Sequence, residues 1–258
     1  MGHERVGFLP KTKPWKGVVK QITGFTGTEA DTSAIASATL SNVRSRFEAI
    51  QHDSGIKAAF KFLVALSVSA SAEFSEDVAP YGLQLSSKLS PFAFAKLVQQ
   101  WVNNHCDSLE YAQLAKGAAS DAIANWYNEK SNQKWLFQSE NEQTEVWSQA
   151  ATGAGFCELS RLFFAKFTER YLNYFLERQA SVSCNSIEQR DSLKEQLRKH
   201  IEVVSKHAFE TAKITQSFAA GWYNNRTKEG LPSDQEVEGF LAIAFGKIRE
   251  ELRREEEK

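Results

Sequence analysis

The residues best suited to hold a metal ion lie in the C-terminal half of the chain. His200 and His207 are seven positions apart and Glu210 follows three residues later, so one α-helix would bring the three side chains near one face. Imidazole and carboxylate groups are common zinc ligands. However, the Glu-x-x-His pairs of carboxylate-bridged bundle sites occur nowhere in the chain. Two interpretations therefore remain open. These residues, together with Glu169, form a metal site or polar pocket, or the histidines are simply solvated or hydrogen-bonded.

A pair of glycines, Gly153-x-Gly155, precedes a helical pattern and invites comparison with phosphate-binding loops. Exposed backbone amides at the start of a helix can bind an anion. Here no buried strand is expected before the glycines, and both the G-x-G-x-x-G and the Walker patterns are absent. We interpret the glycines as a structural break between two helices.

The strongest local charge lies near the N-terminus, where a group of cations surrounds a tryptophan and only Glu4 opposes them. The group consists of Arg5, Lys11, Lys13, Trp15, Lys16 and Lys20. Cations attract phosphates and an aromatic ring can stack on a base, so nucleic acid is one alternative partner. Pro10 and Pro14 also suit an extended arm that packs on a protein partner, and Trp15 could dock on the core of its own chain.

Aromatic residues recur at helical spacing farther along the chain and cover more than one helical face. Most of them are expected in the core, and any part left exposed would form a protein-binding surface. The interface candidates are Phe164, Tyr171, Phe175, Phe218 and Trp222.

Motifs of enzymatic catalysis are missing from the sequence. Cys106, Cys157 and Cys184 never form a C-x-x-C pair, which argues against a zinc knuckle and a disulfide framework. There is no G-x-S-x-G elbow, and no S-x-x-K occurs with its companion motifs. We therefore lean away from an enzyme and expect no cofactor.

The elements that must position these residues are predicted to be helices, because apolar residues repeat at steps of three and four. The expected helices cover approximately residues 15–22, 28–53, 56–72, 92–105, 108–130, 144–179, 187–228 and 233–252. Ser186-x-x-Gln189 and Ser233-x-x-Glu236 have the order of capping boxes, which mark helix starts. No alternating strand pattern is found.

The predicted fold class is all-α, a multi-helix bundle with two long antiparallel helices in the C-terminal half. We expect a basic N-terminal arm over 1–27, an N-terminal helical subdomain over 28–130 and a C-terminal long-helix subdomain over 144–253. The two subdomains could also form one continuous domain.

Composition narrows the classes of function. Lys plus Arg total 31 against 32 Asp plus Glu, so the net charge of -1 creates no global field for a polyanion. The most apolar window, Ala58–Ala72, contains Lys61 and is shorter than the roughly 20 residues of a membrane-spanning helix. The N-terminus lacks the apolar segment of a secretion signal. We expect a cytoplasmic protein without a membrane span.

The leading functional hypothesis is a non-enzymatic helical assembly protein that binds a protein partner, forms a homo-oligomer, or does both. One context is an accessory subunit of a multi-protein bacterial system such as antiviral defence. The alternatives are a nucleic-acid-associated factor that uses the basic arm, and an enzyme or ligand binder with a polar or metal pocket in the C-terminal helices.

Overall fold

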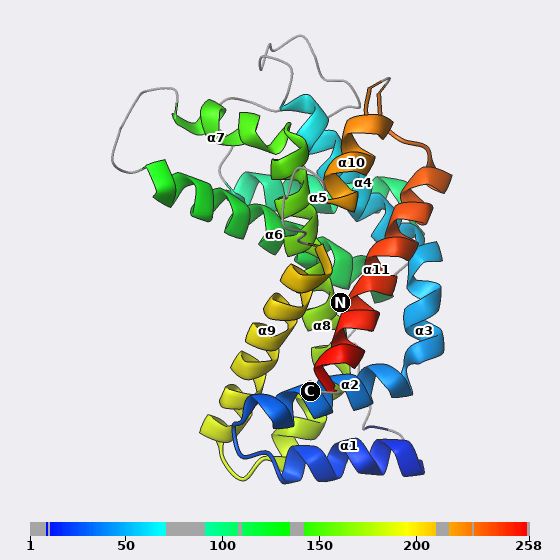
Figure 1. Ribbon diagram of the computed structural model, residues 1–258, viewed down its shortest axis with the longest axis vertical. Helices are drawn as coiled ribbons and strands as arrows, with labels where there is room; N and C mark the ends of the chain where they lie inside the picture. Colours follow the sequence, from blue (N-terminus) through cyan, green and yellow to red (C-terminus); the bar gives the residue numbers. More distant parts are fainter. Residues whose placement is uncertain are drawn as a thin grey trace. The chain divides into compact units, whose positions relative to one another are not determined.

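The computed structural model describes residues 9, 11–70, 91–107, 110–134, 142–209, 217–228 and 230–256. All regular structure in these residues is helical, which confirms the predicted fold class (Figure 1). The helices are α1 Lys13–Thr23, α2 Glu29–Asn42, α3 Arg44–Ala49, the short 3-10 helix η1 Ile50–His52, α4 Ser54–Ser69, α5 Pro91–His105, α6 Glu110–Lys134, α7 Glu142–Ala150, α8 Gly153–Ser183, α9 Ile187–Phe209, α10 Phe218–Arg226 and α11 Asp234–Glu256.

Both predicted capping boxes begin a helix. The Ser186 hydroxyl accepts a hydrogen bond from the Gln189 amide at 3.1 Å, and the Gln189 side chain accepts one from the Asn185 amide at 2.6 Å. At the start of α11 the Ser233 hydroxyl accepts from the Glu236 amide at 3.3 Å, while the Glu236 carboxylate accepts from the Ser233 amide at 2.9 Å. These bonds satisfy backbone donors that the helix itself leaves without partners.

The prediction of one continuous helix over 187–228 was wrong. Helix α9 ends at Phe209, and Ser217 has an extended backbone with φ -62° and ψ 152°. The Ser217 hydroxyl accepts a hydrogen bond from the Ala220 amide at 3.1 Å, so a separate helix, α10, begins there. The apolar spacing continues on both sides of this cap, and spacing alone therefore does not reveal the break.

The segment 28–53 was also predicted as one helix, and it is divided at Val43. This residue ends α2 with φ -106° and ψ 13°, and α3 and η1 follow. The chain turns there without a glycine or proline, so no local signal in the sequence marks the division.

The helices are organised in two units, and each unit is assembled from segments that are far apart in the sequence. Unit 1 contains residues 1–49, 168–208 and 246–258, and unit 2 contains residues 50–167 and 209–245. Helices α8 and α11 each contribute residues to both units. The subdomain bounds expected from the sequence stay a prediction.

The core of unit 2 is built around Phe60 on α4, which is completely buried. Its ring stacks on Phe240 with centroids 4.9 Å apart, and four more aromatic rings surround it. They belong to Phe156, Phe163, Phe164 and Trp222, with centroids 6.0, 5.9, 5.6 and 6.1 Å from that of Phe60. The apolar segment that includes Phe60 is thus a central helix, as its sequence predicts.

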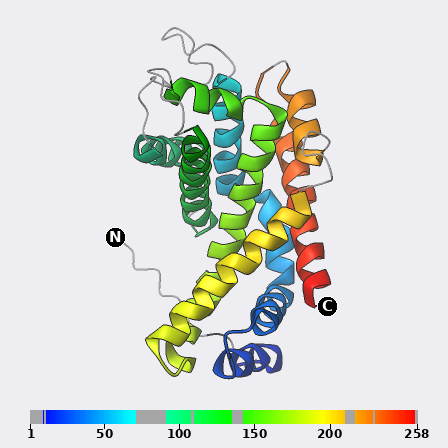
Figure 2. The same ribbon diagram turned by 60° about the vertical axis from the view of Figure 1, so that its left-hand side comes forward.

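Unit 1 holds the second part of α8 packed with α9, and the two helices follow one another through a short turn (Figures 1 and 2). This hairpin confirms the prediction of two long packed helices in the C-terminal half. The ring of Tyr171 packs on Phe47 of α3 with centroids 5.5 Å apart. Trp15 of α1 stacks on Phe175 at 5.9 Å, so α1 is held against α8.

None of the described helices combines the length and the apolar character needed to cross a lipid bilayer.

Candidate functional site

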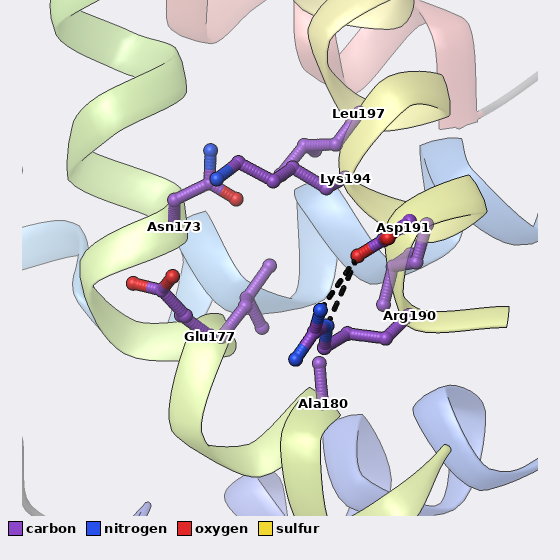
Figure 3. A pocket seen from close by; sticks show the side chains of 9 residues that line it. Asn173, Glu177, Ala180, Arg190, Asp191, Lys194 and Leu197 are labelled. Atoms are coloured by element: carbon purple, nitrogen blue, oxygen red, sulfur yellow. Dashed lines mark hydrogen bonds and ion pairs between the residues drawn. The ribbon is translucent and has the colours of Figure 1, made fainter. Parts of the chain in front are cut away.

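A small slot lies between the end of α8 and the beginning of α9, within unit 1. Its volume is about 140 Å³. The floor consists of buried apolar side chains, namely Leu176 and Ala180 from α8 and Leu193 and Leu197 from α9. Figure 3 shows the labelled lining residues on the two neighbouring helices. The slot is therefore apolar at the bottom and bounded by two rigid elements.

Polar and charged side chains form the rim of this slot. Arg190 donates two hydrogen bonds to one carboxylate oxygen of Asp191, at 3.1 Å from Nε and 2.9 Å from Nη2. Lys194 extends from α9 toward α8, where Asn173 lies, and Glu177 stands on the α8 side (Figure 3). Charges of both signs thus surround an apolar floor.

Helical spacing explains how the sequence builds the slot. Asn173, Leu176 and Ala180 are three and four residues apart, so they share one face of α8. Arg190, Lys194 and Leu197 share a face of α9 in the same way. Ala180 carries only a methyl group, and a larger side chain at that position would enter the cavity.

Two exposed apolar residues flank the same turn. Ile187, the first residue of α9, is 66% exposed, and Val182 near the end of α8 is 64% exposed. Ile187 precedes Arg190 and Asp191 by three and four residues, so it extends the face of α9 that lines the slot. The end of the hairpin therefore offers a depression and an apolar projection side by side on one helix face.

The basic residues near the N-terminus lie mainly on one side of α1. Lys13, Lys16 and Lys20 are exposed and follow spacings of three and four, whereas the opposite face, with Trp15 and Val18, is buried. Lys11 is exposed just before the helix, and Arg5 lies outside the described residues. We call Lys11, Lys13, Lys16 and Lys20 the lysine ridge. Within the described part of the chain, no ion pair involves these four lysines.

The proposed metal or polar residues occupy different environments. His200 is 4% exposed, whereas the His207 side chain is 49% exposed and lies 3.5 Å from the Glu251 carboxylate. Glu169 is half-buried on α8, and Glu210 falls outside the described residues. Among the residues that the structure describes, no group of three metal-binding side chains converges. The pocket with these residues stays a prediction.

The aromatic interface candidates are covered to different degrees. Phe164 and Tyr171 are completely buried, and Phe164 packs on Phe209 with ring centroids 5.4 Å apart. Phe175, Phe218 and Trp222 are partly exposed. A single helical pattern does not separate core from interface, because both require apolar side chains at the same spacing.

Gly153 and Gly155 lie in the first turn of α8, and close packing requires a glycine at residue 155. A Cβ atom on Gly155 would lie 1.9 Å from the Gln149 carbonyl oxygen, so only glycine fits there. The Gly155 amide donates to the Thr152 hydroxyl at 3.0 Å. These contacts agree with a break between helices.

A second cavity was not predicted from the sequence. It has a volume of about 420 Å³ and is bordered by α2, α3 and the last turns of α11, all in unit 1. We call it the arginine cavity, and its lining residues are Ser37, Leu40, Ser41, Arg44, Arg249, Glu250, Leu252 and Arg253. The i, i+4 spacing of Arg249 and Arg253 places both on one helix face, but nothing in the sequence shows that Arg44 joins them.

No protein-family model, no curated protein and no solved structure matches this chain.

Proposed function

We propose that this chain is a non-enzymatic helical interaction protein that assembles with a protein partner through the end of the α8–α9 hairpin. The observation that carries the proposal is the apolar slot with its charged rim. Its volume of about 140 Å³ is below the roughly 300 Å³ at which small-molecule pockets begin. A cavity of this size instead accepts one apolar side chain, as the anchor residues of protein interfaces require.

The rim suggests how a partner would be selected. Lys194 favours an acidic group beside the anchor, whereas Glu177 favours a basic one on the α8 side. Charges at the edge of an interface mainly set specificity and the rate of association. Ile187 adds exposed apolar area next to the slot, so the partner would contact both features.

A second copy of this chain is the other occupant consistent with these features. In a symmetric dimer the same patch is used by both subunits, so Ile187 of each copy would contact the slot of the other. Light scattering of the purified full chain distinguishes a homodimer from a monomer that binds a different protein.

The proposal is tested by affinity purification of the tagged full chain from its own host after nuclease treatment, with mass spectrometry of the co-purified proteins. Ala180→Phe fills the slot, and Lys194→Glu reverses a charge on its rim. Ala30→Phe is the matched control, because it adds the same ring at an exposed position outside the slot. A near-stoichiometric partner, or a homodimer, should be lost in both slot variants and retained in the control. A monodisperse monomer that captures no protein would refute the proposal.

The biological context remains part of the proposal. We place the chain in the cytoplasm as an accessory subunit of a multi-protein bacterial system such as antiviral defence. The identity of the co-purified protein tests this context directly, because a partner from an unrelated housekeeping complex would contradict it.

The lysine ridge supports a second candidate function, in which the chain is a nucleic-acid-associated factor. When cations contact phosphates, the logarithm of the association constant falls linearly with the logarithm of the salt concentration. The slope is about −0.9 for each phosphate contact on double-stranded DNA. Reversing the charge at Lys11, Lys13 and Lys16 should weaken binding and flatten that slope. Lys96→Glu on α5 is a control, since this lysine is exposed in the other unit. Equal affinity for the ridge variant and the wild type would exclude the ridge.

A further inference from the structure

The arginine cavity differs from the slot in size and in chemistry. Its volume of about 420 Å³ lies within the roughly 300–1,000 Å³ of small-molecule sites. Arg44 at the start of α3 and Arg249 and Arg253 on α11 bring three guanidinium groups to one concave region of unit 1. The cavity can therefore hold a small ligand and present several cations to it.

Two carboxylates hold these guanidinium groups in place. One oxygen of Glu48 accepts hydrogen bonds from Arg44 Nε at 3.0 Å and from Arg249 Nη1 at 2.5 Å. The Glu250 carboxylate accepts from Arg253 Nη2 at 3.1 Å. One oxygen of Glu48 thus bridges Arg44 and Arg249, and a phosphate oxygen that took the place of this carboxylate would meet donors from both guanidinium groups.

The remaining lining suits the uncharged part of a ligand. Leu40 and Leu252 are buried beneath the cavity, and Ser37 and Ser41 supply hydroxyl groups from α2. Hydroxyl groups both donate and accept hydrogen bonds, so they suit sugar or phosphate oxygens.

We infer that the arginine cavity binds a small molecule that carries two or more phosphate groups. Arginine forks match phosphate oxygens in pairs, which favours phosphate over a single carboxylate. The lining contains three arginines and one glutamate, so cationic side chains outnumber anionic ones around the ligand. The limited volume of about 420 Å³ favours a small molecule over a nucleic-acid strand, which would follow an extended groove.

This inference does not depend on the proposed function, because the arginine cavity and the slot share no residue. Failure of the slot variants to change partner capture would leave the arginine cavity untouched. Absence of phosphate binding would likewise leave the assembly proposal intact.

The test is calorimetric titration of the full chain with inorganic tripolyphosphate at low ionic strength, followed by adenosine triphosphate. Arg249→Gln and Arg44→Gln should each weaken tripolyphosphate binding by about tenfold to a hundredfold, since charged hydrogen bonds contribute strongly. Glu48→Gln should have the opposite effect and tighten binding severalfold, because it removes a competing carboxylate.

Tighter binding of adenosine triphosphate than of tripolyphosphate would show that the lining beyond the phosphates also contacts the ligand, and equal binding would assign the site to phosphates alone.

Two controls separate the cavity from general surface charge. Lys199→Gln removes an exposed charge from α9, in the same unit, at a residue that does not line the cavity. Lys96→Gln removes an exposed charge from α5 in the other unit. Both controls should bind tripolyphosphate within about twofold of the wild type, and circular dichroism should show equal helicity in every variant. No measurable binding by the wild type, or equal weakening in the controls and the cavity variants, would overturn the inference.

Discussion

Trp15 stacks on Phe175 with ring centroids 5.9 Å apart and ring planes 28° apart. Trp15 is 7% exposed, so its ring is covered by the chain itself. Among the described residues of the basic N-terminal segment, the lysines of the lysine ridge are thus exposed while the tryptophan is buried. The stacking also makes α1 a structural part of unit 1.

Replacing Trp15 by alanine should therefore destabilise the protein. Loss of a large buried aromatic side chain typically lowers the free energy of unfolding by about 3–5 kcal/mol. Urea unfolding followed by far-ultraviolet circular dichroism measures the change. Lys16→Ala on the exposed face of α1 should stay within about 0.5 kcal/mol of the wild type. Similar stabilities for the two variants would show that the stacking contributes little.

Gly155→Ala and Gly239→Ala should change stability in opposite directions. The added Cβ at residue 155 would lie 1.9 Å from the Gln149 carbonyl oxygen, so overpacking should cost about 2–3 kcal/mol. At residue 239, within α11, a Cβ meets nothing within 4 Å, and alanine should stabilise by about 0.5–1 kcal/mol because it favours the helix. Thermal unfolding of the two variants provides the comparison, and a stabilised Gly155→Ala protein would contradict the packing at the start of α8.

Ser217→Ala tests the separation of α9 from α10. The Ser217 hydroxyl accepts from the Ala220 amide at 3.1 Å and donates to the Cys157 sulfur at 3.0 Å. Its loss should lower the free energy of unfolding by about 1–2 kcal/mol, as for other helix caps. If the helix were continuous through residue 217, the substitution should instead raise the free energy of unfolding, since alanine is the better helix former by about 0.5 kcal/mol.

A matched control for that substitution is Ser181→Ala, which removes an exposed hydroxyl inside α8. The control should be neutral or slightly stabilising in the same urea titration. Destabilisation of both proteins by the same amount would remove the case for a special role of Ser217.

Glu236 should make stability depend on pH. Hydrogen bonds from the Ser233 amide, and then from the Ser233 hydroxyl, hold the pKa of the Glu236 carboxyl below its usual value, despite the opposing effect of desolvation. A lowered pKa in the folded state stabilises the protein above the unfolded pKa of about 4.3, and this contribution is lost as the pH falls through the folded pKa. The difference in urea midpoint between wild type and Glu236→Gln should thus be constant near neutrality and shrink in acid. A difference that does not vary between pH 7 and pH 2 would contradict the capping box.

Local features of the sequence were sufficient for much of the fold. The repeat of apolar residues at steps of three and four predicts helices because it creates one face that must be buried. The two capping boxes are readable because their donors and acceptors are three residues apart. Phe60 and its neighbours are apolar on nearly every side, which predicts a helix surrounded by others. These properties belong to single segments and need no knowledge of what packs against them.

Three features were decided only by the tertiary structure. The first is where a helix is interrupted without a glycine or proline, as at Val43. The others are which aromatic side chains are buried and which residues from distant segments come into contact. Ser217 begins a new helix where its hydroxyl meets Cys157, and Arg44 approaches Arg249 only because α3 and the end of α11 belong to one unit. Such contacts depend on side chains that are far apart in the chain, and the spacing of apolar residues within one segment does not predict them. For the same reason the slot between α8 and α9 could not be predicted, because its depth depends on how closely two helices pack around Ala180.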